Sequence, residues 1–259
     1  MILPASGAAP AEATDEQSAS RAVQSMFNQI APRYDLLNHV LSANVDRVWW
    51  RRTARTFAHI LQNPDATVLD MCCGTGDMTL ALLRYRPANS KPVLALDFAH
   101  SMLVRAGEKF SSPQLSSRRP VIIEADALHM PFADNSVDLI TSAFGFRNLA
   151  NYAAGLQEIH RVLRPGGELG ILDFSEPGGL LGRVYQLYFR HILPRVGRAL
   201  SGPVGQSGAS SPYSYLPQSV HRFPAPEEML AMMRSCGFQD ATWTPYTFGI
   251  AGLYRAVKA

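Results

Sequence analysis

The amino-acid sequence predicts an α/β protein built on a doubly wound, mostly parallel, seven-stranded sheet. Three observations lead to this fold class. Short apolar runs of strand length alternate with segments of helical periodicity from residue 67 onward. Helical segments precede the first strand, which indicates an N-terminal helical cap. A long segment then interrupts the alternation before the last two strands, and we expect it to form a helical lid.

The composition bounds the class of protein. A chain of 259 residues is long enough for one well-buried α/β domain with additions. A formal net charge of +3 is too small to indicate nucleic-acid binding. The three cysteines form no even-numbered, spaced framework, and two of them are adjacent, which indicates free thiols in a reducing compartment. Because we find neither a secretory signal nor an apolar run near the roughly 20 residues that span a bilayer, we expect a cytoplasmic protein.

The N-terminal part of the chain predicts a tail followed by helices. Residues 1–17 are rich in Ala, Pro, Glu and Ser, and we expect them to be disordered. Apolar residues at helical spacing predict a helix over Ser18–Ile30. A short helix is expected after Arg33, and a third helix over Val48–Phe57. The polar side of the third helix is interpreted as a solvated face, with contact to an anion or a membrane as the alternative, and it carries Arg47, Arg51, Arg52 and Arg55.

Five strands are expected in the central part of the chain. Each is a continuous apolar run, which is typical of a parallel strand covered on both faces. Helices begin between them near Asp77, Ser101 and Ala150, and a Pro-Gly-Gly turn ends the last of these helices. The expected strands are Thr67–Cys72, Val93–Asp97, Val121–Glu124, Val137–Ser142 and Glu168–Phe174.

Residues 175–225 break this alternation. A helix is expected over Leu180–Leu193, and a Gly/Ser-rich loop follows it. An insertion of this length is typical of a functional lid or a binding region. A last helix over Glu227–Ser235 then leads to two closing strands, around Ala241–Thr247 and Ile250–Val257.

A glycine turn, Gly74-Thr75-Gly76, follows the first strand. Two residues without Cβ atoms let a ligand approach the backbone, where the next helix offers N–H groups. The turn departs from the dinucleotide-binding fingerprint, because Thr79 stands where a third glycine is needed. Asp77 at the start of the helix would repel a phosphate and attract an ammonium or a sulfonium group.

Carboxylates also follow the next two strands. Asp97 ends the second strand, where it can accept hydrogen bonds from ribose hydroxyls, and Asp126 follows the third strand. Taken singly, Asp77 could be a helix cap and Asp126 a turn residue. Taken together at consecutive strand ends, the three acids predict a site for a neutral or cationic nucleoside.

With these motifs in this order, residues 65–175 resemble the class I S-adenosylmethionine-dependent methyltransferases, which have a Rossmann-like sheet. The resemblance implies S-adenosylmethionine as the cofactor. It implies that Asp97 holds the ribose and that Asp126 and Ala127 recognise the adenine. The turn that packs on the methionine part of the cofactor contains Asp70, Gly74, Thr75 and Gly76.

Flanking motifs extend the resemblance over residues 23–240. Phe144-Gly145-x-Arg147-Asn148 and Tyr213-x-Tyr215-Leu216 are similar to motifs of the ubiquinone/menaquinone-biosynthesis C-methyltransferases. This family resemblance implies methylation of a ring carbon of a polyprenylated hydroquinone, either demethylmenaquinol or a ubiquinol precursor. The segments 188–194 and 223–224 favour the menaquinone branch.

The pattern of elements predicts a domain division, and the family resemblance adds partners. One methyltransferase domain over 18–259 is expected, with a helical cap (18–62), a cofactor-binding core (63–174), a substrate lid (175–225) and a C-terminal helix with strands (226–259). The lid could line a groove for the isoprenoid tail or rest on the inner face of the membrane, or it could simply cover the sheet. Oligomeric state stays open.

The chemistry of a sulfonium methyl group suggests roles for four residues. The protein must align the methyl with an aromatic carbon and assist removal of a hydroxyl proton. We expect Arg147, with Asn148 beside it, to stabilise a quinolate or orient a water, and an ion pair to Asp173 or Asp35 is the alternative. Asp173 is a candidate acid or base, and Tyr34 a candidate to close over the cofactor, each with a structural role as the alternative. No spacing indicates a metal site.

Three competing functions remain open at this stage. The acceptor could be another lipid-like molecule, such as a sterol or a phospholipid amine. The chain could be a cofactor-binding subunit that has lost catalysis. A dinucleotide oxidoreductase is the third hypothesis, and Thr79 and Asp77 speak against it.

Overall fold

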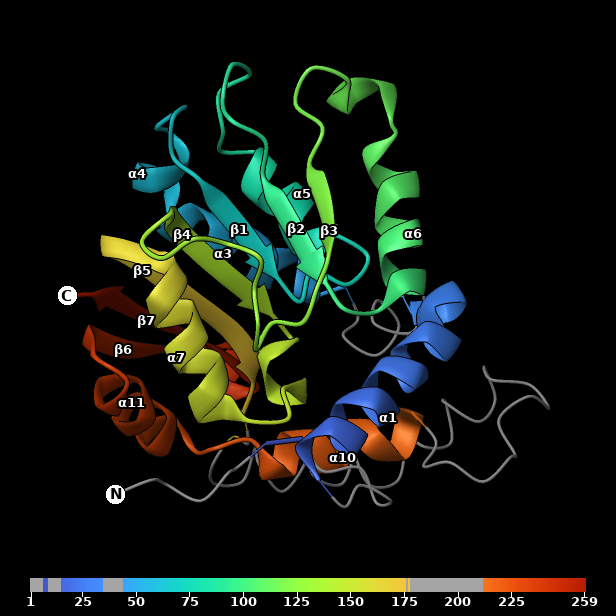
Figure 1. The fold of residues 1–259 in the computed structure, drawn as a ribbon, viewed down its shortest axis with the longest axis vertical. Coiled ribbons are helices and arrows are strands. Elements are labelled where there is room, and N and C mark those ends of the chain that lie inside the picture. The colour runs from blue at the N-terminus through green and yellow to red at the C-terminus, as the bar shows by residue number, and fades with distance from the viewer. Residues whose placement is uncertain (1–6, 9–14, 35–43, 176, 178–211) are drawn as a thin grey trace.

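The computed structural model of the protein describes residues 7–8, 15–34, 44–175, 177 and 212–259. Within these residues one sheet has seven strands in the order β3-β2-β1-β4-β5-β7-β6 (Figure 1). The strands β1 to β5 run parallel, whereas β7 is antiparallel to β5 and β6. The prediction of a doubly wound, mostly parallel, Rossmann-like seven-stranded sheet is confirmed.

The strands match the expected positions closely, with one difference in burial. β3 forms one edge of the sheet, and its Val121 and Ile122 are 43% and 38% exposed. The expectation that every parallel strand is covered on both faces is therefore wrong for β3. The strand bounds are β1 (Val68–Met71), β2 (Leu94–Asp97), β3 (Val121–Glu124), β4 (Val137–Ala143), β5 (Leu163–Phe174), β6 (Phe238–Tyr246) and β7 (Ala251–Lys258).

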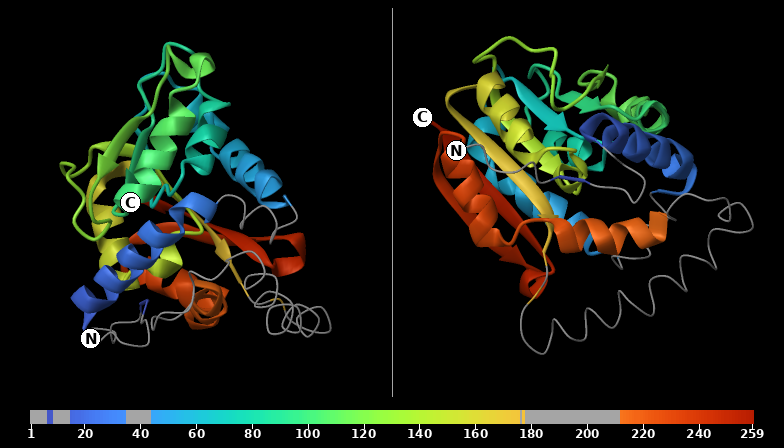
Figure 2. Two further views of the ribbon diagram at one scale, coloured as in Figure 1. Left: turned by 90° about the vertical axis from the view of Figure 1, so that its right-hand side faces the viewer. Right: turned by 60° about the horizontal axis from the view of Figure 1, so that its bottom comes forward.

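Helices cover both faces of the sheet and the carboxyl ends of its parallel strands. The buried clusters place α3 (Asp46–Thr56), α4 (Ala58–Leu61), α5 (Asp77–Leu83) and α6 (His100–Phe110) on one face. They place α7 (Tyr152–Val162) and α11 (Pro226–Ser235) on the other. The helices α1 (Glu16–Ile30) and α10 (Pro212–Arg222) lie together at the carboxyl end of the parallel strands (Figures 1 and 2).

Part of the N-terminal segment has a defined structure. The side chain of Asp15 caps α1 by accepting the N–H of Ser18, so the helix begins two residues before the expected Ser18. Ala8 lies within the predicted tail, yet it is buried beside Val23 and donates its N–H to the carbonyl of Leu149. At least this residue of the tail has a defined place, and residues 1–6 and 9–14 lie outside the described ones.

Other boundaries shift for local reasons. β5 begins five residues before the expected Glu168, because Leu163 already pairs with Val137 before a register shift. α7 ends at Val162, as the Pro-Gly-Gly stop predicts. The expected turn is not separate from the strand, because it lies in the irregular start of β5, where Gly166 has a φ of 77°. After α1 the structure has a 3-10 helix, η1 (Ala31–Arg33). The short helix expected after Arg33 and the lid helix over 180–193 fall largely on residues outside the described ones.

The sheet positions the site by alternation of side chains along each strand. In β1, Leu69 and Met71 belong to the cluster that includes α7, whereas Val68 faces α3 and α5. Asp70 shares the face of Val68, and its carboxylate meets the hydroxyl of Thr79 on α5. No helix within the described residues has an apolar stretch long enough to cross a membrane.

Candidate active site

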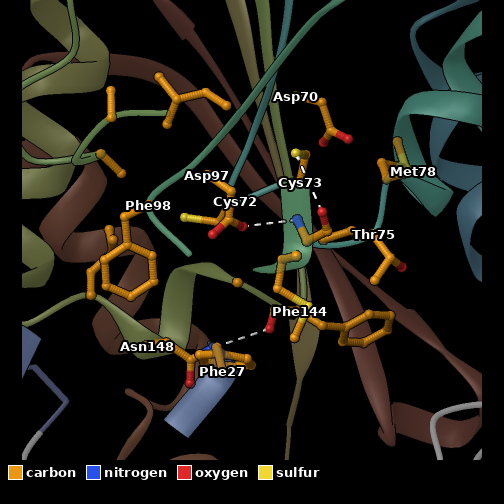
Figure 3. Close-up of a pocket in the computed structure, with 18 of the residues that line it drawn as sticks. Phe27, Asp70, Cys72, Cys73, Thr75, Met78, Asp97, Phe98, Phe144 and Asn148 are labelled. Atoms are coloured by element: carbon orange, nitrogen blue, oxygen red, sulfur yellow. Dashed lines mark hydrogen bonds between the residues drawn. The ribbon is translucent and has the colours of Figure 1, made fainter. Parts of the chain in front are cut away.

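A pocket lies at the carboxyl ends of β1, β2 and β4, between the sheet and the N-terminal helices (Figure 3). The empty space in and above it, open solvent included, is about 930 Å³. This edge of an open parallel sheet is where ligands bind in doubly wound folds. Its walls come from the glycine turn, the end of β2, the segment after β3, the segment after β4, and the cap residues Phe27, Tyr34 and Trp50.

Asp70 lies at the floor of the pocket and is completely buried. Its carboxylate accepts hydrogen bonds from the hydroxyls of Thr79 and Thr141, at 2.5 and 3.2 Å. Burial raises the pKa of Asp70 to about 7, although the two hydroxyls oppose this shift. Asp70 was expected from the sequence. Thr79 was considered only as evidence against a dinucleotide, and its hydrogen bond to the carboxylate of Asp70 was not expected.

The two glycines of the turn have different roles. Gly74 and Gly76 have φ values of 54° and 87°, which side chains rarely adopt. A Cβ on Gly74 would point into the pocket, with Tyr34 Cε1 at 4.0 Å as its nearest neighbour. A Cβ on Gly76 would lie 2.4 Å from Cζ of Phe110. Gly74 therefore opens the backbone to a ligand, whereas Gly76, which does not line the pocket, permits packing of α6.

Asp97 connects the turn to the end of β2. It accepts the N–H of Gly74 at 2.8 Å, drawn as a dashed line in Figure 3, and the N–H of Ala99 at 2.9 Å. The side chain is buried, which raises its pKa, and the backbone N–H groups counteract that rise. Asp97 thus holds the turn in place and also lines the pocket, as the ribose-binding prediction requires.

Asp77 was expected to attract a cationic ligand, but in the structure its carboxylate pairs with a lysine of the chain. Lys109 on α6 donates to the carboxylate of Asp77 at 3.0 Å and to the hydroxyl of Thr75 at 2.9 Å. The negative charge at the start of α5 is therefore offset by an ammonium group from within the chain. Both Thr75 and Asp77 line the pocket.

Asp126 and Ala127 line the pocket where the chain leaves β3. The carboxylate of Asp126 accepts the N–H of Leu128 at 2.9 Å, which is the turn role weighed as its alternative. Its side chain stays 44% exposed, so oxygen atoms remain accessible, while Ala127 is buried. This geometry serves the turn and leaves the carboxylate accessible from the pocket.

The four predicted catalytic residues divide into two pairs. Tyr34 and Asn148 line the pocket, but Arg147 and Asp173 do not. Arg147 and Asp173 are buried and form an ion pair of 2.7 Å, which is the alternative considered for them. Burial lowers the pKa of Arg147, yet Asp173 and the nearby Tyr34 outweigh it and raise that pKa overall. The pair therefore lies directly behind the pocket wall.

These features match a known family. The profile of the ubiE/COQ5 methyltransferase family matches residues 13–258. The chain belongs to the ubiE/COQ5 methyltransferase family. It is therefore an S-adenosylmethionine-dependent methyltransferase, and the oxidoreductase hypothesis is excluded.

Individual relatives of this ubiE/COQ5 methyltransferase cover nearly the whole chain. The demethylmenaquinone methyltransferase of Deinococcus radiodurans is 46% identical, over 94% of this chain and 95% of that protein. A ubiquinone/menaquinone biosynthesis C-methyltransferase of Geobacter sulfurreducens is 40% identical, over 91% of this chain and 88% of that protein. Among solved structures, the CurJ carbon methyltransferase shares the fold, with a TM-score of 0.64, 16% identity, and coverage of 94% of this chain and 68% of that one.

The pocket of this family member fits S-adenosylmethionine. The space above Gly74 would be filled by any larger side chain, and Asp97 and Asp126 present carboxylates at the adjoining strand ends. These residues, with Asp70, Thr75 and Ala127, would hold the cofactor. Within the part of the chain that the structure describes, no group of His, Cys, Asp or Glu could hold a metal ion.

Several residues that shape the site escaped the sequence analysis. Phe144 has a φ of 60°, and its ring lies 4.5 Å from that of Phe174. A Cβ on Gly145 would lie 2.4 Å from Cβ of Cys72, so glycine is required where β4 meets the glycine turn. Tyr215 on α10 donates to Oδ1 of Asn148 at 3.2 Å. Phe144, Gly145 and Tyr215 all belong to the motifs quoted from the sequence, but the sequence alone assigned no role to any of them.

Proposed function

We propose that this methyltransferase transfers a methyl group from S-adenosylmethionine to a ring carbon of a polyprenylated hydroquinone, converting demethylmenaquinol to menaquinol. The observation that carries the proposal is the 46% identity to a demethylmenaquinone methyltransferase along nearly the full length of both chains. The open pocket at the cofactor-binding edge of the sheet supports it.

S-adenosylmethionine supplies a methyl group that is already activated by its sulfonium centre. The protein therefore has to align the acceptor and help the hydroxyl lose its proton. We assign the alignment to Tyr34 and Asn148, since both line the pocket. Asn148 is fixed from two sides, because it donates to the carbonyl of Phe144 and accepts from Tyr215.

The ion pair of Arg147 and Asp173 supports this arrangement from behind. Arg147 donates to the carbonyl of Phe144 as well as to Asp173, and Asp173 accepts the backbone N–H of Arg147. These bonds lock η3 (Phe146–Asn148) onto the end of β5. We infer that the pair positions Asn148, and that the charge of Arg147 favours a quinolate across the wall of the pocket.

The second candidate is methylation of the equivalent ubiquinol precursor. It is favoured by the similarity to relatives named for both pathways, such as that of Geobacter sulfurreducens. The two acceptors present a similar hydroquinone edge. We further propose that the protein works in the cytoplasm at the inner face of the membrane, where a polyprenylated acceptor resides.

Quinone profiling of a strain that lacks this protein tests the function. Loss of the methyl group from menaquinone, restored by the wild-type gene, is the expected result. Loss of the methyl group from ubiquinone would instead assign the second candidate. Unchanged quinones in the deletion strain, together with a missing methyl on a sterol or a phospholipid amine, would overturn both.

A further inference from the structure

The outer face of α3 is basic. Four arginines and Val48 lie on it, and Val48 is 59% exposed. The opposite face of the helix is buried and contains Trp49, Trp50, Thr53 and Ala54. This is an amphipathic helix whose exposed side is nearly all cationic, and the arginines are Arg47, Arg51, Arg52 and Arg55.

Within the described residues, no acidic side chain neutralises the positive charge of this face. In the part of the chain that the structure describes, none of the four arginines forms an ion pair. Asp46, the acid at the start of α3, is buried and accepts the backbone N–H of Arg47. Arg52 lies 4.3 Å from the ring centre of Tyr246. The other three guanidinium groups face outward, although the formal net charge of the whole chain is only +3.

An exposed aromatic side chain lies next to this helix. Phe248 is 84% exposed at the tip of the turn η6 (Thr247–Gly249), between β6 and β7. Three successive residues of this turn have positive φ values, of 45°, 59° and 86°. Such backbone strain persists where the surrounding structure enforces it and is concentrated at functional sites.

Hydrogen bonds fix the turn to α3 and to the end of β5. The indole N–H of Trp49 donates to the hydroxyl of Thr247 at 2.8 Å, and Ser175 donates to the carbonyl of Gly249 at 2.6 Å. The bond from Trp49 holds η6 against α3, and Val48, the residue before Trp49, is exposed as Phe248 is. The next residue, Trp50, lines the pocket. The basic face thus lies on the outside of the helix whose inner side borders the site.

We propose that the surface formed by Arg47, Val48, Arg51, Arg55 and Phe248 docks this protein on an anionic lipid bilayer. Arginines at a negative membrane surface and an apolar side chain inserted among the headgroups together give reversible attachment. The proposal rests on the proposed function in one respect, since a polyprenylated acceptor has to be collected from a bilayer. It places attachment on α3 and η6. For the arginines of α3 the sequence left membrane contact as the alternative to a solvated face, and it considered the lid as another membrane surface.

Co-sedimentation with vesicles tests the docking surface. Phosphatidylcholine vesicles are compared with vesicles that also contain about one third phosphatidylglycerol, at low and high salt. The wild-type protein is expected to bind the anionic vesicles, and to bind less at high salt. Replacing three arginines (R47Q/R51Q/R55Q) should weaken binding by about fivefold per arginine, hence on the order of 100-fold.

A matched control separates the effect of this surface on binding from the effect of the overall net charge. The variant R84Q/R119Q/R234Q removes three exposed arginines elsewhere, so both variants lower the formal net charge from +3 to 0. The control should bind within about twofold of wild type. Equal loss in both variants, or equal binding of wild type to neutral and anionic vesicles, would overturn the proposal.

Insertion of Phe248 has its own readout. In the Phe248→Trp variant, the emission of the new tryptophan should shift to shorter wavelength when anionic vesicles are added. Val104 on α6 is 49% exposed, and Val104→Trp should show no shift beyond that of wild type. Phe248→Ser should weaken vesicle binding about tenfold. A blue shift at Val104 rather than at Phe248 would contradict this surface.

Methyl transfer to a short-tail acceptor dissolved in water separates this proposal from the function. The R47Q/R51Q/R55Q variant should keep wild-type activity on that acceptor and lose it on a long-tail acceptor in vesicles. Wild-type vesicle binding by this variant overturns docking and leaves the function standing. A correct binding pattern without methyl transfer by the wild-type protein overturns the function and leaves docking standing.

Discussion

At the scale of single residues, the turn after β1 separates two glycines that look equivalent in the sequence. The space beside Gly74 belongs to the pocket, whereas the space beside Gly76 belongs to the ring of Phe110. Motif spacing locates both residues but cannot show which neighbour each one faces. That information depends on α6, which follows some twenty-five residues later and packs on the turn only in the folded chain.

Alanine substitutions should therefore have different effects at the two glycines. Gly74→Ala should weaken S-adenosylmethionine binding at least tenfold while lowering the free energy of unfolding by about 1–2 kcal/mol, the cost of a left-handed alanine. Gly76→Ala adds a clash with Phe110 and should lower the free energy of unfolding by about 2–4 kcal/mol. Calorimetric titration and urea unfolding measure the two quantities. Similar losses of stability in both variants would contradict this division.

Asp70 should make the stability depend on pH in an unusual direction. Its folded-state pKa is raised from 3.8 to about 7, so the folded state binds a proton more tightly than the unfolded state. The contribution of Asp70 to stability is present below pH 4 and is lost as the pH rises toward 7. The loss should be on the order of 2–4 kcal/mol, and Asp70→Asn should abolish it.

Urea unfolding of wild type and Asp70→Asn at several pH values, without cofactor, measures this difference. The variant should become more stable relative to wild type between pH 4 and 7. A difference that is constant across this range would show that Asp70 titrates near its ordinary value.

The ion pair of Arg147 and Asp173 should respond differently to single and double replacement. Arg147→Met leaves a buried carboxylate without its partner, which should cost about 3–5 kcal/mol in the free energy of unfolding. The double variant R147M/D173L should recover most of that stability. Because the account also gives the charge of Arg147 a part in favouring the quinolate, the double variant should fold but transfer the methyl group more slowly than wild type. A stable double variant with wild-type activity would contradict both the positioning role and the electrostatic role of the pair.

At the scale of elements, α10 reaches the site through one hydrogen bond. Tyr215 is buried against Val23 of α1, and its hydroxyl meets Asn148 of η3. Three segments distant in the sequence therefore converge on one side chain of the pocket. Burial raises the pKa of Tyr215 to about 12, so the hydroxyl remains protonated and acts as a donor near neutral pH.

Tyr215→Phe tests this connection with the smallest possible change. The variant leaves Oδ1 of Asn148 without this donor, and it should lower the free energy of unfolding by about 1 kcal/mol. We expect kcat to fall severalfold while the affinity for S-adenosylmethionine stays unchanged. Tyr85→Phe, a tyrosine outside the pocket lining, serves as the matched control. Unchanged kcat in Tyr215→Phe would show that Asn148 needs no support from α10.

The hydrophobic pattern along the sequence predicts most helices and strands correctly. The errors arise where an element depends on the strands beside it in the sheet. The strands β1, β2 and β4 were predictable because buried parallel strands are continuous apolar runs. The exposure of β3 could not be predicted in this way, because its place at the edge depends on the order of strands in the sheet. Likewise, the extension of β5 to Leu163 depends on its pairing with Val137.

At the scale of the whole molecule, the site joins residues from nearly every part of the described chain. The sequence predicted the carboxylates at the strand ends, since each follows its own strand. It could not predict that Lys109 would offset Asp77. It offered an ion pair of Arg147 with Asp173 or Asp35 only as the alternative to an active-site role, and the structure has the pair with Asp173. These contacts form between segments separated by 26 residues or more, and only the folded sheet brings them together.

The central claim is that this family member methylates the ring carbon of a polyprenylated hydroquinone. The most direct test incubates the purified protein with demethylmenaquinol and S-adenosylmethionine that carries a labelled methyl group, and then locates the label in the product. We predict the label on the ring carbon, and its absence when Gly74 is replaced by a larger residue. Label on oxygen or nitrogen, or no transfer under conditions where the cofactor binds, would contradict the account.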